Sequence, residues 1–174
     1  MKKLLSVLIF SIIFFIIIFN YSRNADTNVS YDRFNLVAPG IVRTPEERFN
    51  NIPDYVFDAN YINIGDLRIH YLDEGPSDGE IIFLLHGQPT WSFLFRKMIP
   101  TLTQAGYRVI APDMVGFGKS DKYISIQDYS HQMHVDTMTY LIRELDLKNI
   151  TAHVHDWGGL VGLRVIAEEP DRFS

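Results

Sequence analysis

A five-residue apolar run, Ile81-Ile82-Phe83-Leu84-Leu85, ends at His86-Gly87 and most constrains how this chain can fold. Continuous apolar runs are typical of strands that are buried on both faces, because half-exposed strands alternate apolar and polar residues. Two further short segments, 108–111 and 150–155, also predict buried strands, and helical patterns lie between the strands. Strands that alternate with helices over short connections predict an α/β fold with parallel strands and crossover helices.

The intervening segments carry the helical patterns. Residues 91–103 predict one helix, and residues 158–169 predict another that ends before Pro170. The strongest amphipathic pattern spans residues 128–147, where apolar residues recur at i, i+3, i+4 and i+7, namely Met138, Leu141, Ile142 and Leu145. Upstream, residues 55–64 and 67–72 are predicted to form a β-hairpin that turns at Gly65-Asp66.

Residues 1–21 must be set apart from the fold. Met1-Lys2-Lys3 precedes Leu4–Phe19, an uncharged apolar run, which as a helix would span about 24 Å against a hydrocarbon core of roughly 30 Å. The following residues contain no convincing small-residue cleavage site. We expect an N-terminal hydrophobic helix that acts as a signal anchor, with a cleaved signal peptide or a buried core helix as alternatives. The basic start predicts a membrane-anchored or secreted protein whose remainder lies on the exported side.

Charge and cysteine content exclude several classes of function. The net charge is −5, and this acidic balance argues against nucleic acid as a partner. The absence of cysteine excludes disulfides, a Cys-ligated zinc site and a thiol nucleophile. Residues 22–50 are polar, lack a clear period and predict a linker with an irregular leader. Residues 51–174 are then predicted to form the α/β part.

The chemistry-bearing residues gather at Val154-His155-Asp156-Trp157-Gly158-Gly159. A strand that turns tightly into a glycine-flanked helix is the setting of a nucleophile elbow, with Asp156 at its apex. We expect Gly158 to relieve crowding at the turn, and Gly159 and Gly162 to let the helix approach the sheet. Val154 stands where the strict pattern has a glycine. The alternative is that Asp156 merely caps the following helix.

An aspartate nucleophile restricts the reaction class. Its attack on an acyl carbon would give a high-energy anhydride, which argues against esterase or protease chemistry. Its attack on a saturated carbon displaces a leaving group and gives an ordinary ester. Water can then hydrolyse that ester with help from an oxyanion hole and a base. The sequence therefore indicates alkyl halides or epoxides as substrates.

Two loops are predicted to meet the elbow at the same edge of the sheet. His86-Gly87-Gln88-Pro89-Thr90-Trp91 follows the first buried strand, where an oxyanion loop belongs in this architecture. Backbone amides of Gln88 and Trp157 could therefore converge on one oxygen. The glycine-containing segment 113–121 follows the second strand. Three signals in this order are more specific than the elbow alone.

With these motifs the chain resembles the haloalkane dehalogenase family of α/β-hydrolases. The matching segments are Arg43–Phe49, Tyr71–Gly75, His86–Pro100, Pro112–Lys122 and Asp156–Gly159. The resemblance implies an α/β-hydrolase fold, a small hydrophobic halogenated substrate and no cofactor or metal. It also implies that Asp156 is the catalytic nucleophile, that the Trp157 indole helps bind the halide, and that Gln88 and Trp157 supply oxyanion-hole amides. The Gln88–Pro89 peptide bond is expected to be cis.

The resemblance covers only the part of the family pattern up to the elbow. No histidine follows Asp156 that could act as a general base. All six histidines precede it, namely His70, His86, His131, His134, His153 and His155. We therefore expect residues 51–174 to be the N-terminal part of an incomplete α/β-hydrolase domain that is inactive alone. There are two alternatives to the dehalogenase function. One is an epoxide hydrolase, and the other is a non-catalytic membrane-tethered remnant that binds hydrophobic ligands.

We expect structural roles for most of the histidines and consider one for Trp91. His131 and His134 are expected to be exposed and not to bind metal, since no acidic segment accompanies them. His86 is expected to form hydrogen bonds within its loop, and His155 to point away from Asp156. Trp91 could line the pocket or anchor the helix after the loop.

Overall fold

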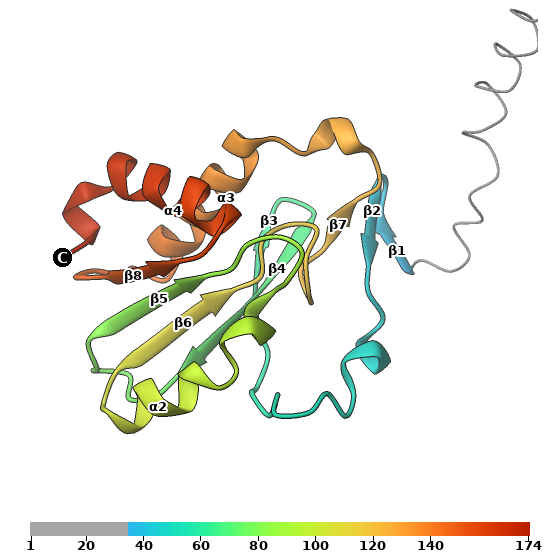
Figure 1. The fold of residues 1–174 in the computed structure, drawn as a ribbon. Coiled ribbons are helices and arrows are strands. Elements are labelled where there is room, and N and C mark those ends of the chain that lie inside the picture. The colour runs from blue at the N-terminus through green and yellow to red at the C-terminus, as the bar shows by residue number, and fades with distance from the viewer. Residues whose placement is uncertain (1–34) are drawn as a thin grey trace, which may run out of the picture. The chain divides into compact units, whose positions relative to one another are not determined.

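The computed structural model describes residues 35–174 (Figure 1). The predicted N-terminal hydrophobic helix, residues 1–21, lies outside these described residues. No helix within residues 35–174 is both long enough and apolar enough to cross a membrane.

The main sheet has five strands in the order β3-β4-β6-β5-β8. In chain order these are β3 (Asn60–Ile64), β4 (Leu67–Glu74), β5 (Ile81–Leu85), β6 (Arg108–Pro112) and β8 (Thr151–Val154). Strands β3 and β4 form the predicted hairpin, and β4 pairs with β6 in antiparallel orientation. Strand β5 pairs in parallel with β6 on one side and with β8 on the other. The expected α/β fold is confirmed, and its parallel part consists of β6, β5 and β8.

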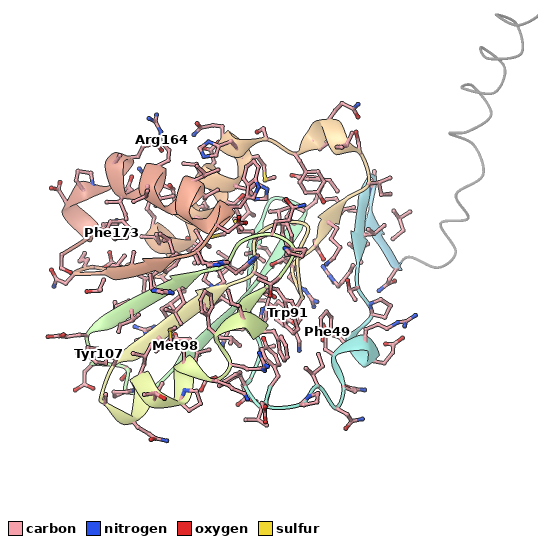
Figure 2. All side chains as sticks on the ribbon, in the orientation of Figure 1. Phe49, Trp91, Met98, Tyr107, Arg164 and Phe173 are labelled. Carbon is pink, nitrogen blue, oxygen red and sulfur yellow. The ribbon has the colours of Figure 1, made fainter. Side chains whose placement is uncertain are left out.

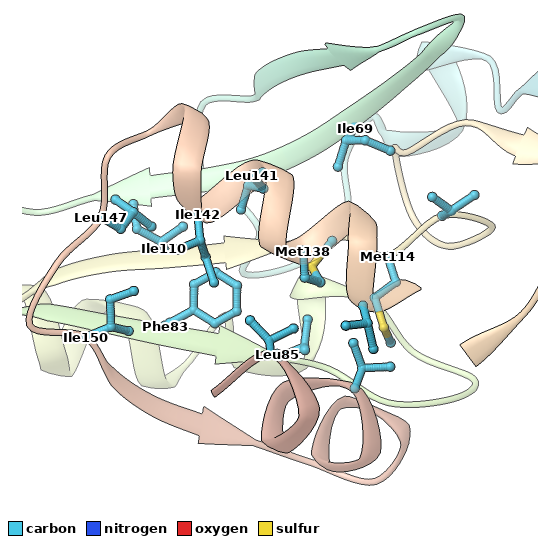
Figure 3. Packing of buried hydrophobic residues seen from close by; sticks show 14 of the residues in the cluster. Ile69, Phe83, Leu85, Ile110, Met114, Met138, Leu141, Ile142, Leu147 and Ile150 are labelled. Atoms are coloured by element: carbon cyan, nitrogen blue, oxygen red, sulfur yellow. The ribbon is translucent and has the colours of Figure 1, made fainter. Parts of the chain in front are cut away.

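Alternating side chains of β5 explain why its sequence is apolar throughout. Phe83 and Leu85 belong to the larger hydrophobic core, which α3 (His131–Glu144) and α4 (Trp157–Glu168) also line. Leu84 belongs to a second core that includes Ile99 of α2 (Met98–Gln104). Helix α2 therefore covers one face of the sheet and the other two helices cover the opposite face (Figure 1). Figure 3 shows the larger core, with Met138, Leu141 and Ile142 of α3 packed toward Phe83 and Leu85.

The helix predicted over residues 91–103 is instead two pieces. A 3-10 turn spans Ser92–Phe95 and α2 begins at Met98. Pro100 gives the physical reason, because its ring clashes with the carbonyl four residues earlier and is tolerated only in the first turn of a helix. Helix α2 starts two residues before Pro100, which places the proline in that first turn. The other 3-10 turns within residues 35–174 are Glu46–Phe49, Ile126–Asp128 and Pro170–Arg172.

Part of the predicted polar linker has regular structure. Strands β1 (Asn35–Ala38) and β2 (Ile41–Arg43) form an antiparallel pair, and β2 also pairs with β7 (Lys122–Tyr123). Ile41 is buried, and Arg43 makes a bidentate ion pair at 2.7 and 2.8 Å with the buried carboxylate of Asp121. The irregular leader expected over residues 22–50 is therefore wrong for residues 35–43, because contacts distant in sequence stabilise strands that have no local period.

Strand β8 is an edge strand of the main sheet rather than the fully buried strand that its sequence predicts. The side chains of Thr151 and His153 are exposed, while Ala152 and Val154 are half-buried. Ile150 just before the strand is fully buried in the larger core. The carboxyl end of β8 leads directly into the turn before α4.

Candidate functional site

Asp156 lies in the tight turn between β8 and α4 with φ 55° and ψ −123°. A positive φ at a non-glycine residue is strained, and such strain is common where a turn must present a catalytic side chain. The backbone of α4 approaches the sheet closely, since a side chain at Gly158 would overlap the carbonyls of Leu85 and His86. A Cβ at Gly162 would lie 2.7 Å from Val154. Both glycines therefore act as predicted.

Gly159 does not share that role. A Cβ there would meet only Val154, at 4.0 Å, which is ordinary van der Waals contact. The expectation that Gly159 also permits close approach to the sheet is therefore wrong.

The Asp156 carboxylate faces the oxyanion loop. Its Oδ1 accepts a hydrogen bond of 2.9 Å from the backbone N–H of Gln88, and the Gln88–Pro89 bond is cis as expected. The backbone N–H of Trp157, followed by that of Gln88, lowers the pKa of Asp156, so the group is ionised at neutral pH. Its side chain makes no capping hydrogen bond to α4. The capping alternative does not account for this geometry.

Gly87 is a site residue that sequence reasoning missed. A Cβ at this position would overlap the Cβ and Oδ1 of Asp156 and the carbonyl of His155. Only glycine therefore lets the loop come close enough for the Gln88 amide to reach the carboxylate. The place of Gly87 beside Gln88, a predicted oxyanion-hole residue, was an available signal. Glycine is common where the backbone of one segment must approach another segment closely.

His86 holds the oxyanion loop to the loop after β6. Its Nδ1 donates to the Gly87 carbonyl at 3.0 Å, and its Nε2 accepts from the Met114 N–H at 3.0 Å. The side chain is fully buried, and burial lowers its pKa so that the neutral imidazole fits both contacts. The predicted structural role of His86 is confirmed.

The loop after β6 is built around the buried carboxylate of Asp113. This group accepts hydrogen bonds from the Ser92 and Lys119 backbone amides at 2.8 and 2.9 Å, and it contacts His70 Nδ1 at 2.8 Å. Burial alone would raise the pKa of Asp113, but the His70 hydrogen bond and the charges around it hold that pKa below its ordinary value. Asp113 thus connects the loop after β6 and the Ser92 end of the oxyanion loop to His70 of strand β4.

Trp91 anchors the end of the oxyanion loop. Its ring lies 4.7 Å from that of Tyr55 and 5.4 Å from that of Phe49, measured between ring centroids, and it stacks on Phe93 at 5.7 Å. Figure 2 shows Trp91 beside Phe49 of the leader. The structure favours the anchor over the pocket-lining role, because the pocket described next does not include Trp91 among its lining residues.

A pocket of about 460 Å³ opens next to the elbow. Its lining combines apolar side chains with a few polar groups: Gln88, Met114, Gly116, Phe117, Ile126, Tyr129, His134 and Trp157. Trp157 is 42% exposed and Gln88 belongs to the loop that bonds Asp156. The two predicted oxyanion-hole residues thus share one pocket wall.

The two histidines of α3 differ from each other. His131 is exposed as predicted, and its Nε2 contacts the Leu160 carbonyl at 3.2 Å. His134 is half-buried in the pocket wall, so the expectation that it is exposed is wrong. It sits one helical turn further along α3, on the side that faces the pocket. Among residues 35–174, no cluster of three or more His, Asp or Glu side chains is suited to holding a metal ion.

The chain is similar to curated haloalkane dehalogenases. It is 57% identical over 139 residues to one from Psychrobacter cryohalolentis and 54% identical over 137 residues to one from Mycolicibacterium paratuberculosis. These matches cover 77% and 76% of this chain but 46% of each relative. The chain thus spans about half the length of the curated relatives it matches.

Solved structures agree on the fold. A tetrameric haloalkane dehalogenase from Paraglaciecola agarilytica NO2 matches with a TM-score of 0.74 and 49% identity, over 77% of this chain and 46% of that one. An epoxide hydrolase from Vigna radiata matches with a TM-score of 0.63 and 27% identity, over 69% and 38% of the two chains. The family described as alpha/beta hydrolase fold matches residues 80–174. With its strand–turn–helix elbow and its parallel β6-β5-β8 core, this chain belongs to the alpha/beta hydrolase fold family.

Proposed function

We propose that this protein is a haloalkane dehalogenase-like hydrolase that converts a small hydrophobic haloalkane to an alcohol. The observation that carries the proposal is the placement of Asp156. An ionised aspartate stands at a strained elbow, bonded to the Gln88 N–H, beside a largely apolar pocket. Identities of 49–57% to haloalkane dehalogenases support the same assignment.

The first step is displacement at a saturated carbon. Because Oδ1 of Asp156 is held by the Gln88 N–H, the other carboxylate oxygen is available to attack the carbon that bears the halogen. A carbon–oxygen bond forms while the carbon–halogen bond breaks, and the halide leaves with the bonding electrons. The Trp157 indole in the pocket wall can donate its N–H to that halide. The product of this step is an alkyl ester of Asp156.

The second step is hydrolysis of that ester. Water attacks the ester carbonyl carbon, and negative charge develops on the oxygen that faces the Gln88 and Trp157 amides, which act as the oxyanion hole. Collapse releases the alcohol and restores the carboxylate. The proton lost by water must pass to a base. No histidine follows Asp156 in these 174 residues, so we expect the chain tested alone to stop at the ester.

Intact-mass spectrometry after incubation with 1-bromobutane tests this proposal. We expect up to one butyl group added per chain, with release of an equal amount of bromide. Asp156→Asn should remove both signals, because an amide is a far weaker nucleophile. A folded wild-type chain that gains no adduct, or a variant that gains the same adduct, would overturn the assignment.

An epoxide hydrolase is the second candidate, because solved epoxide hydrolases share the fold at 27–30% identity. The same assay separates the two activities. An epoxide such as 1,2-epoxyhexane would add its whole mass to Asp156 without any halide release. Adduct formation with the epoxide alone would favour this candidate over dehalogenation, and a folded chain that reacts with neither reagent would favour the non-catalytic remnant.

We also propose that residues 1–21 attach the protein to a membrane and place residues after about Tyr21 on the exported side. The support is the uncharged run Leu4–Phe19 behind Lys2 and Lys3. Fractionation of the tagged full chain beside a variant without residues 2–21 tests this. We expect the full chain in the membrane fraction and the shortened one outside it, whereas equal distribution of both would contradict the proposal.

A further inference from the structure

Ile126 is an apolar residue that the core of the protein does not hold. It begins the 3-10 turn Ile126–Asp128 in the segment between β7 and α3 (Figure 1). It is 77% exposed, and among residues 35–174 it belongs to neither hydrophobic core. Single exposed apolar residues are common on protein surfaces, so exposure alone assigns no role to Ile126.

A second observation concerns where Ile126 lies, which is in the wall of the pocket beside the elbow. The same wall contains Gln88 and Trp157. Because Ile126 is exposed, a ligand in the pocket can contact its side chain directly and remove it from water. Burial of apolar surface is favourable, so this contact stabilises an apolar ligand. Ile126 is therefore accessible to an alkyl chain and matches its chemistry.

The turn that carries Ile126 has a defined position. The Asp128 N–H donates to the Ser125 carbonyl at 3.2 Å, and the Ile126 carbonyl accepts from the Tyr129 N–H at 3.2 Å. Tyr129, which also lines the pocket, is held in turn by the protein. Its hydroxyl donates to the Tyr123 carbonyl at 3.2 Å, and the two rings lie 5.6 Å apart. The backbone thus presents Ile126 at a fixed place in the pocket wall.

The size of the pocket leaves room for a chain longer than butyl. Its volume of about 460 Å³ falls within the roughly 300–1,000 Å³ of pockets that bind drug-sized ligands. In the proposed reaction the carbon that bears the halogen lies at the elbow, beside Trp157. The rest of the alkyl chain then extends along the apolar part of the wall, which Met114, Phe117 and Ile126 form.

We propose that Ile126 sets the chain-length specificity of this site by contacting the distal carbons of the alkyl chain. The site then favours longer primary haloalkanes, such as 1-bromohexane, over 1-bromobutane. This inference rests on the proposed dehalogenase function and names the substrate class within it. Each methylene that is buried against apolar side chains favours binding by about fourfold. Primary bromoalkanes differ little in intrinsic reactivity toward a carboxylate, so their relative rates report on binding.

Rates of Asp156 alkylation at low reagent concentration, followed by intact-mass spectrometry, test the inference. In the wild-type chain, the two additional methylenes of 1-bromohexane should raise the rate over that of 1-bromobutane by up to about fifteenfold. Ile126→Ala should lower this hexyl-to-butyl ratio by about fourfold or more, because the distal contact is lost. Ile124→Ala is the matched control. Ile124 stands in the same segment, is 38% exposed and does not line the pocket, so the ratio should stay at the wild-type value.

A second readout does not depend on alkylation. Titration of the full chain with 1-hexanol, followed by isoleucine methyl NMR signals, should shift the signal of Ile126 and leave that of Ile124 in place. An equal hexyl-to-butyl ratio in the wild type and Ile126→Ala, or an Ile126 signal that 1-hexanol does not shift, would overturn the inference. A folded chain that binds 1-hexanol at Ile126 but is never alkylated would overturn the proposed function instead, so the two failures are distinguishable.

Discussion

The backbone N–H of Gln88 donates to Oδ1 of Asp156 at 2.9 Å, which joins two loops whose residues are 68 positions apart in the chain. The contact fixes the position of Oδ1 of the carboxylate. It also places an amide where negative charge would develop on the ester oxygen. In the proposed reaction, this one hydrogen bond would stabilise the charged nucleophile in the first step and the oxyanion in the second.

The lowered pKa of Asp156 predicts how alkylation depends on pH. The Trp157 and Gln88 amides favour the ionised form, so the pKa lies below the ordinary 3.8. A lowered pKa keeps the nucleophile charged at every pH above that value. We expect the rate of adduct formation with 1-bromobutane to stay constant between pH 8 and pH 5. An acid limb above pH 5, in protein that circular dichroism shows to be folded, would contradict this.

Replacement of Gly87 by alanine should disable the nucleophile. The new Cβ would overlap the Cβ and Oδ1 of Asp156, so either the loop or the carboxylate must move. A misplacement of about 1 Å can cost on the order of 100-fold in rate. We expect a loss of that order in the rate of Asp156 butylation. Gly159→Ala is the control, since its Cβ meets nothing closer than 4.0 Å, and it should keep the wild-type rate.

The two adjacent glycines at the start of α4 should differ in their effect on stability. A Cβ at Gly158 would overlap the carbonyls of Leu85 and His86, which are backbone atoms of the central strand and its loop. Overpacking of this kind costs typically about 1–3 kcal/mol. Gly159→Ala should be neutral or slightly stabilising, because alanine is the better helix former. Denaturant melts of the two variants beside the wild type measure the difference, and equal midpoints would refute it.

Loss of the Asp113 charge should destabilise the loops of the site. Asp113→Asn replaces a fully buried carboxylate that accepts two backbone hydrogen bonds and contacts His70. Hydrogen bonds to a charged group contribute roughly 1.5–3 kcal/mol each, and a neutral amide at this position weakens them. Asp146→Asn is the control. That carboxylate is exposed beside Lys148 and should leave the thermal melting temperature almost unchanged. Similar melting temperatures for both variants would show that the buried pair contributes little.

The elbow was predictable because its signals are local. An apolar strand, an aspartate and closely spaced glycines stand next to one another in the sequence, and the chemistry of an aspartate nucleophile limits the reaction. The stripe of Met138, Leu141 and Ile142 was predictable for the same reason, since a helix buries residues at fixed spacing.

The missed features depend on partners distant in the sequence. Strands β1 and β2 have no local period, and β2 is held by β7 and by the Arg43–Asp121 ion pair. His134 was grouped with His131 by spacing, yet only the packing of α3 against the site shows that one faces the pocket and the other faces solvent. The need for glycine at position 87 arises from Asp156, which lies far along the chain.

The packing of Trp91 on Phe49 and Tyr55 bears on where a working fragment can start. The family match begins at residue 80, and a recombinant piece cut there would retain Gln88 and Asp156. It would lose the aromatic rings that clamp the far end of the oxyanion loop, the Arg43 that neutralises buried Asp121, and the His70 that faces Asp113. The segment upstream of the matched region therefore supports the loops on which Gln88 and Asp156 stand, through contacts made by Arg43, Phe49, Tyr55 and His70.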